Sequence, residues 1–81
     1  MGSSKSLHTS RYQKFLVRLR QARAEAGMTQ VELAKAVRRS QTWVSKCELG
    51  ERRVDAVELE DIAKALGKPM EWFGTNAGES K

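Results

Sequence analysis

The sequence contains a single cysteine and a single histidine, and this scarcity excludes several kinds of site. One cysteine cannot form an internal disulfide, and no spacing typical of zinc ligands is present. We expect Cys47 to be a small core residue rather than a reactive thiol. The histidine, His8, has no positioned partner for acid–base chemistry. We therefore expect no enzymatic activity, no metal and no cofactor.

Long hydrophobic runs are also missing. No apolar stretch approaches the roughly 20 residues that a membrane-spanning helix requires, and the sequence shows no export signal. From these two absences we expect a cytoplasmic protein without membrane contact.

Positive charge is in excess and unevenly placed. The 81 residues include 15 Lys and Arg against 10 Asp and Glu, which gives a net charge of +5. Residues 1–53 hold 12 of these cations and four anions, whereas residues 54–73 hold two cations and five anions. This asymmetry favours a surface that binds a polyanion, although a solvated basic surface without a function is the alternative.

Apolar residues recur at helical spacing along most of the chain, and no segment alternates like a half-buried strand. We predict an all-α domain of about five helices over residues 10–74, between flexible tails at 1–9 and 75–81. Ser10 is the expected N-cap of the first helix, with Gln13 completing a capping box. Further N-caps are predicted at Thr29, Ser40 and Asp55, and helix ends at Gly27, Gly50 and Gly67.

Residues 29–50 contain two short helical patterns separated by a very tight turn. Apolar residues share one face of each pattern: Val31, Leu33, Ala34 and Val37 in the first, Val44 and Cys47 in the second. Helices joined this closely cross at a steep angle, so the second is presented as a ridge. The ridge is polar and cationic on its free side, and its size fits the major groove of DNA.

Over residues 23–67 the sequence resembles the lambda-repressor-like helix-turn-helix domains, the Cro/C1 and Xre type of bacterial transcription regulator. The matching residues keep their order without gaps: Arg23, Gly27 to Gln30, Glu32 to Ala34, Ser40, Val44, Ser45, Glu48, Gly50, Arg52 and Glu58 to Leu66. The resemblance implies a compact five-helix fold with the helix-turn-helix at helices 2 and 3. It also implies an ion pair between Arg23 and Glu48, for which two independent surface charges are the alternative.

Two arginines depart from the family pattern. Arg38 stands at the turn position usually occupied by glycine, and Arg39 stands at the next position, which is usually apolar. A residue other than glycine forced to a positive φ costs about 1 kcal/mol. We therefore expect a turn that is either reshaped or slightly strained, with two cations where the phosphate backbone would pass.

The resemblance places helix 3 in the major groove of a double-stranded DNA operator. Gln41, Thr42 and Lys46 are then the candidates for base contacts, unless they form only a solvated helix face. The candidates for DNA backbone contacts are Gln30, Arg38, Arg39, Trp43, Ser45, Arg52 and Arg53. For Trp43, packing over the domain as peripheral core is an equal alternative.

A single domain of this kind reads few base pairs, and relatives dimerise on half-sites about 34 Å apart. We expect a homodimer that acts mainly as a repressor, with Met70, Trp72 and Phe73 of the last helix as its candidate contact. The alternative is a protein-interaction module, antitoxin or controller with a toxin or polymerase as its partner. The acidic fourth helix, with Glu58, Glu60 and Asp61, is its candidate surface, although solvated charge is the default explanation of these residues.

Overall fold

The computed structural model describes residues 9–74, which form four α-helices and a short 3-10 helix: α1 (Ser10–Glu25), α2 (Gln30–Val37), α3 (Gln41–Leu49), α4 (Ala56–Leu66) and η2 (Met70–Phe73). The expected all-helical class is confirmed, and these residues contain no strand. The count of five α-helices is not confirmed, because the last segment is a four-residue 3-10 turn. His8 and the predicted tails, apart from Thr9, lie outside the described residues.

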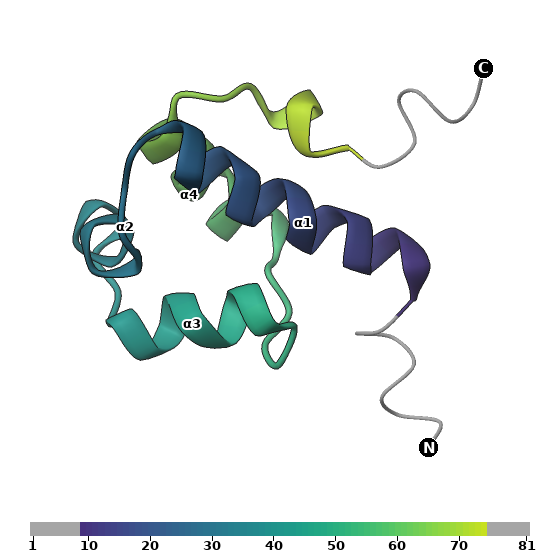
Figure 1. Cartoon of the computed structure of the whole chain (residues 1–81), viewed down its shortest axis with the longest axis horizontal. Helices are drawn as coiled ribbons and strands as arrows, with labels where there is room; N and C mark the ends of the chain where they lie inside the picture. The colour runs from purple at the N-terminus through teal and green to yellow at the C-terminus, as the bar shows by residue number, and fades with distance from the viewer. Residues whose placement is uncertain (1–8, 75–81) are drawn as a thin grey trace.

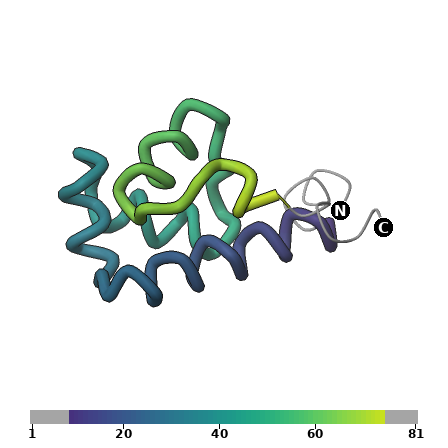
Figure 2. Tube along the Cα trace, turned by 90° about the horizontal axis from the view of Figure 1, so that it is seen from above, coloured from purple at the N-terminus to yellow at the C-terminus, as the bar shows by residue number. Residues whose placement is uncertain are grey.

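The helices are arranged so that α3 lies along one edge of the molecule. In Figure 1, α1 and α3 both run across the view, while α2 is seen nearly end-on and connects them. The α2 and α3 helices therefore cross steeply, as the short turn between them predicted. The η2 segment lies at the opposite edge from α3, and the view from above shows α1 running along one side of the other elements (Figure 2).

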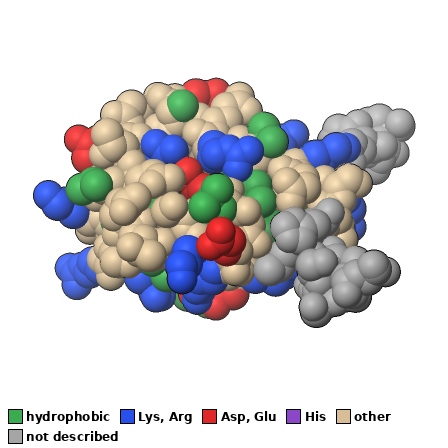
Figure 3. Space-filling model, turned by 60° about the horizontal axis from the view of Figure 1, so that its bottom comes forward, with side chains coloured by type: hydrophobic (Ala, Val, Ile, Leu, Met, Phe, Trp, Pro, Cys, Tyr) green, Lys and Arg blue, Asp and Glu red, His purple; other side chains and the backbone are tan. Residues whose placement is uncertain are grey.

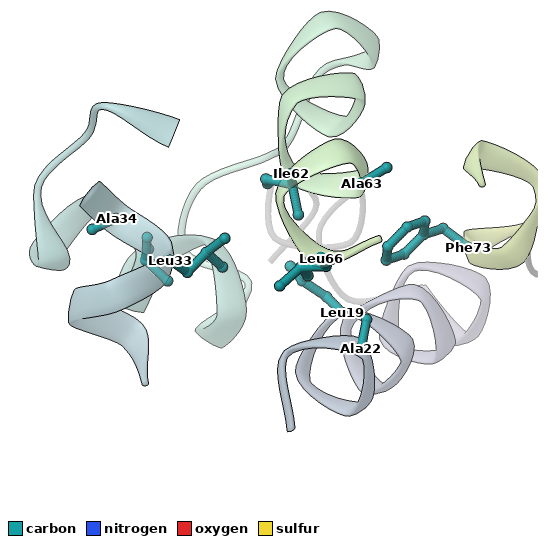
Figure 4. Close-up of a cluster of buried hydrophobic side chains, with 9 residues drawn as sticks. Leu19, Ala22, Leu33, Ala34, Ile62, Ala63, Leu66 and Phe73 are labelled. Atoms are coloured by element: carbon teal, nitrogen blue, oxygen red, sulfur yellow. The ribbon is translucent and has the colours of Figure 1, made fainter. Parts of the chain in front are cut away.

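One hydrophobic core connects every element. Its buried members come from all four α-helices and from η2 (Figure 4): Leu19, Ala22, Leu33, Ala34, Val44, Ile62, Ala63, Leu66 and Phe73. Burying such side chains supplies the main favourable free energy of folding. Because Val44 is in this core, the inward side of α3 is fixed and its other side faces outward.

Local side chains fix where the helices begin. Thr29 and Asp55 each form a complete capping box, with Glu32 and Glu58 as the reciprocal partners, and Ser40 caps α3 by accepting from Trp43 N. These three predicted caps are confirmed. The predicted cap at Ser10 is wrong, because Thr9 accepts the hydrogen bond from Tyr12 N at 3.1 Å and Ser10 is already helical.

Two predictions about apolar residues are also corrected. Val31 is 49% exposed, because it lies beside the stripe that Leu33, Ala34 and Val37 form on α2 rather than within it. In the last segment, Phe73 is buried in the core and Trp72 is half-buried. Phe73 is therefore not available as a contact between copies of the chain.

Within residues 9–74, none of the helices combines the length and the apolar character that crossing a membrane requires.

Candidate nucleic-acid interface

The α3 helix presents a mostly polar ridge on the side opposite the core, with Leu49 exposed at its end. Val44, Cys47 and Glu48 are buried beneath it, while Gln41, Thr42 and Lys46 are exposed. The three residues predicted to contact bases thus lie on the free side of the helix. Figure 3 brings this side of the molecule forward and shows Lys and Arg side chains spread over it, interrupted near the centre by apolar and acidic ones.

The turn between α2 and α3 is strained rather than reshaped. Arg38 adopts the left-handed conformation with φ 61° and ψ 44°, and within residues 9–74 it is the one non-glycine residue with positive φ. This conformation is unfavourable for a residue with a Cβ, by about 1 kcal/mol. A backbone hydrogen bond stabilises the turn: Arg39 N donates to Ala34 O at 2.9 Å. Arg38 and Arg39 are both exposed beside the start of α3.

A buried ion pair ties α3 to α1. Arg23 Nε lies 2.6 Å from Glu48 Oε2, and its Nη2 donates to Oε1 at 3.0 Å. Only 3% of the Glu48 side chain is exposed, so this carboxylate depends on its partners. Arg23 also donates to Met28 O at 3.0 Å, and the hydrogen bond with Glu48 raises the pKa of Arg23. The pair fixes the carboxyl-terminal half of α3 against the body of the molecule.

Gln30 connects this ion pair to the exposed ridge. Its Nε2 donates to Glu48 Oε1 at 3.0 Å, and its Oε1 accepts a hydrogen bond from Gln41 Nε2 at 2.7 Å. Gln30 is thus half-buried at the start of α2, and its side chain is shared between a structural residue and a candidate base contact. The sequence placed Gln30 near a phosphate but gave no sign of these two contacts.

Trp43 packs against the core and against two arginines. The guanidinium carbons of Arg39 and Arg52 lie 4.8 and 5.2 Å from its ring centroid, within the range of cation–π attraction. The indole is half-buried, and its Nε1 is buried without a hydrogen-bond partner. Of the two readings of Trp43 that the sequence left open, this position favours peripheral core.

Glu58 joins the same two arginines. Arg52 donates from Nη1 to Oε1 and from Nη2 to Oε2, both at 2.8 Å, while Arg39 Nη2 lies 3.7 Å from Oε2. The hydrogen bonds from Arg52, more than any other cause, lower the pKa of Glu58 to about 2. The same pairing raises the pKa of Arg52. The sequence predicted the capping box of Glu58 but not its contacts with Arg39 and Arg52, because these arginines lie in two separate connecting loops.

The side chains of two other backbone-contact candidates, Arg53 and Ser45, have different surroundings. Arg53 lies over the Tyr12 ring at 4.5 Å, near the start of α1, where Val54 N donates to the Tyr12 hydroxyl at 3.1 Å. Ser45 is half-buried on α3. The structure therefore brings the side chains of Arg39, Trp43 and Arg52 together. The Arg53 side chain lies over Tyr12, while its backbone O accepts a hydrogen bond from Arg52 Nη1 at 2.9 Å.

The described residues offer hydrogen bonds and positive charge rather than a site for a metal. In residues 9–74, no three His, Cys, Asp or Glu side chains are grouped to hold an ion. Cys47 is buried, and the loss of solvent raises the pKa of its thiol. A thiol in this state packs as a small apolar group and is a weak nucleophile.

Comparison with known proteins identifies similar sequences. Residues 15–71 match a family model described as a helix-turn-helix domain. Over 56 residues the chain is 39% identical to a protein of Rhodospirillum rubrum named "Uncharacterized transcriptional regulator in ATPase CF(0) region". This match covers 69% of the chain and 52% of that protein, so the chain spans about half the length of the curated relative.

Proposed function

Because this chain belongs to the helix-turn-helix domain family, we propose that it is a transcriptional regulator that binds double-stranded DNA. The observation that carries the proposal is the ridge of Gln41, Thr42 and Lys46 on the exposed side of α3. A similar protein named as a transcriptional regulator supports the same function. The proposal includes no enzymatic activity.

In the proposed complex, α3 enters the major groove and its ridge reads base edges. Gln can hydrogen-bond adenine with two bonds, Thr contacts the thymine methyl group, and Lys suits guanine. Phosphates on either side would be contacted by Gln30, Arg38, Arg39, Ser45, Arg52 and Arg53, and Trp43 packs against Arg39 and Arg52. Such contacts set affinity and register, and the base contacts set the preferred sequence.

The finer assignment is a repressor of the Cro/C1 or Xre type that binds as a homodimer to a two-fold operator. The motif from Gly27 to Gln30 and the Arg23–Glu48 pair support the type, because both have their places in that resemblance. Occupying an operator is enough to block a polymerase, so repression requires no further site. Half-sites about 34 Å apart would accommodate two copies.

Selection of bound sites from random duplex DNA tests this function. We expect enrichment of a short motif in two inverted copies, and retention on heparin that is lost as the salt concentration rises. Enrichment of a motif in one copy would support DNA binding and contradict the dimer. Indifference to duplex and heparin at low salt would contradict the function. It would favour the alternative, a protein-interaction module, antitoxin or controller whose partner is a protein.

A further inference from the structure

Glu58 contacts the proposed DNA-binding surface from a helix that is not part of it. It lies in the first turn of α4, where its Oε1 accepts a hydrogen bond from Asp55 N at 3.0 Å. The capping box therefore holds the carboxylate in place from its own helix. The side chain is only 10% exposed, so its position is set by the fold rather than by solvent.

Both arginines that pair with Glu58, Arg52 by two hydrogen bonds and Arg39 by an ion pair at 3.7 Å, remain open to a ligand. The side chains of Arg52 and Arg39 are 38% and 44% exposed, although both approach Glu58 and the Trp43 ring. A guanidinium group has five N–H donors in a rigid plane, so a carboxylate on one edge leaves others for a phosphate. The cluster of two arginines, one carboxylate and one indole therefore retains a net positive charge.

Holding an arginine side chain in place lowers the entropic cost of its binding to a phosphate. A free arginine side chain loses rotamer freedom when it docks on a phosphate, whereas a side chain already held loses little. Arg52 has two hydrogen bonds to Glu58 and a third to Arg53 O at 2.9 Å. Its guanidinium group is therefore already ordered next to α3.

We propose that Glu58 is a positioning residue for DNA binding, which holds Arg39 and Arg52 against Trp43 so that both guanidinium groups face phosphates beside α3. This inference rests on the proposed function and adds to it a residue on α4 that does not itself touch DNA.

Because Glu58 is negatively charged, the direction in which DNA affinity changes when the charge is removed tests the inference. Removing a negative charge from a protein strengthens its attraction to a polyanion if the charge acts only at long range. Removing a positioning residue has the opposite effect, because the arginines lose their fixed orientation. The variant Glu58→Gln distinguishes the two effects. Glu60→Gln is the matched control, since it removes the same charge from an exposed position two residues further along α4.

Filter binding measures the effect with the full chain and a random-sequence duplex of about 30 base pairs, long enough for two half-sites. We expect the log–log salt dependence of binding to flatten by about 0.9 for each phosphate contact that Glu58→Gln loses. With equal affinities at 1 M salt, each lost contact makes the variant bind about eight-fold more weakly than the unmodified chain at 0.1 M salt. Glu60→Gln is expected to bind with unchanged or slightly higher affinity and an unchanged slope.

Further variants separate positioning from stability. Circular dichroism establishes that Glu58→Gln is folded at the assay temperature. If it is not, Glu58→Asp replaces it, because this change keeps the charge and withdraws it by one methylene group. In an Arg39→Gln/Arg52→Gln background, Glu58→Gln is expected to cause no further change in slope.

Two results would overturn the inference. One is that Glu58→Gln binds like Glu60→Gln or more tightly, and the other is that it binds more weakly with an unchanged salt slope. Failure of the unmodified chain to bind the duplex at low salt would instead overturn the proposed function, and this inference with it.

Discussion

At the scale of single residues, Gln30 links the surface of α3 to the interior. It accepts a hydrogen bond from Gln41 and donates one to Glu48, which in turn is held by Arg23. The exposed amide of Gln41 is therefore oriented by a chain of contacts that ends at a buried carboxylate. A base contact made from such a side chain has less freedom to adapt to a wrong base than one made from a mobile side chain.

The roles of base and backbone contacts predict different effects of substitution. Gln41→Ala is expected to lower the discrimination at one base pair by about 1–3 kcal/mol, without a change in salt dependence. Arg53→Gln is expected to flatten the salt slope by about 0.9 while the preferred sequence stays the same. Binding titrations on the selected site and on its single-base variants measure both. Equal weakening on all sequences with unchanged slopes would show that these roles are misassigned.

Glu58 also makes the folding stability of the protein depend on pH in the acid range. Its pKa in the folded chain is lowered from an ordinary value of 4.5 to about 2, chiefly by hydrogen bonds from Arg52. The unfolded chain therefore takes up this proton first, and the stabilisation present above pH 4.5 is lost as the pH falls towards 2. Thermal unfolding followed by circular dichroism is expected to show a fall in melting temperature over this range.

The variant Glu58→Gln is expected to reduce the acid-dependent fall without abolishing it. A second contribution remains, because the hydrogen bond from Lys68 lowers the pKa of Glu25 as well. An identical pH dependence in the variant and the unmodified chain would contradict the assignment to Glu58.

At the scale of elements, helix ends could be predicted from the sequence because capping is local. The boxes at Thr29 and Asp55 each involve residues three apart, and Gly27 and Gly67 adopt the positive φ expected of them. The cap of α1 was wrongly predicted at Ser10, since Thr9 and Ser10 are neighbouring residues whose side chains can both cap a helix. In the structure Thr9 accepts the hydrogen bond from Tyr12 N, and Ser10 is the first helical residue.

The capping assignment for α1 leads to a stability prediction. Thr9→Ala is expected to destabilise the protein by about 1 kcal/mol, because it removes the acceptor for Tyr12 N. Ser10→Ala, its neighbouring control, is expected to change stability by less than about 0.5 kcal/mol. Urea unfolding of the two variants measures the difference. A larger loss in Ser10→Ala than in Thr9→Ala would reverse the assignment.

The parts of the candidate site that sequence alone missed are contacts between elements. Arg39, Trp43 and Arg52 were each recognised as candidates, but no local pattern showed that Glu58 would hold two of them. Helical periodicity relates residues three or four apart on one helix. It does not relate a residue in a turn after α2 to one in the first turn of α4, because that contact depends on how the helices pack.

At the scale of the whole molecule, η2 closes the core on the side away from α3. Phe73 is 2% exposed and lies in the same cluster as Leu19 and Leu66. Trp72 is covered in part by Arg18, whose Nη1 donates to Trp72 O at 2.8 Å. The sequence indicated an amphipathic last segment, but its use in the core rather than between copies follows from the packing of α1 and α4.

This position of Phe73 predicts a loss of stability rather than a change of oligomeric state. Phe73→Ala is expected to destabilise the protein by about 3 kcal/mol, because it leaves a cavity among packed side chains. Met70→Ala, the control on the same segment, is expected to cost less, since Met70 is 38% exposed. Urea unfolding and sedimentation check both variants. An intact fold with a dimer converted to a monomer would show that Phe73 serves an interface.

The two indoles of the chain lie beside cations at opposite edges of the molecule. Trp43 on α3 lies against Arg39 and Arg52, whereas Trp72 in η2 lies against Arg18 and Lys68. Their intrinsic emission therefore reports on two separate surfaces without any added dye. In Trp72→Phe the remaining emission comes from Trp43 and reports binding at α3. In Trp43→Phe it comes from Trp72 and reports binding at η2.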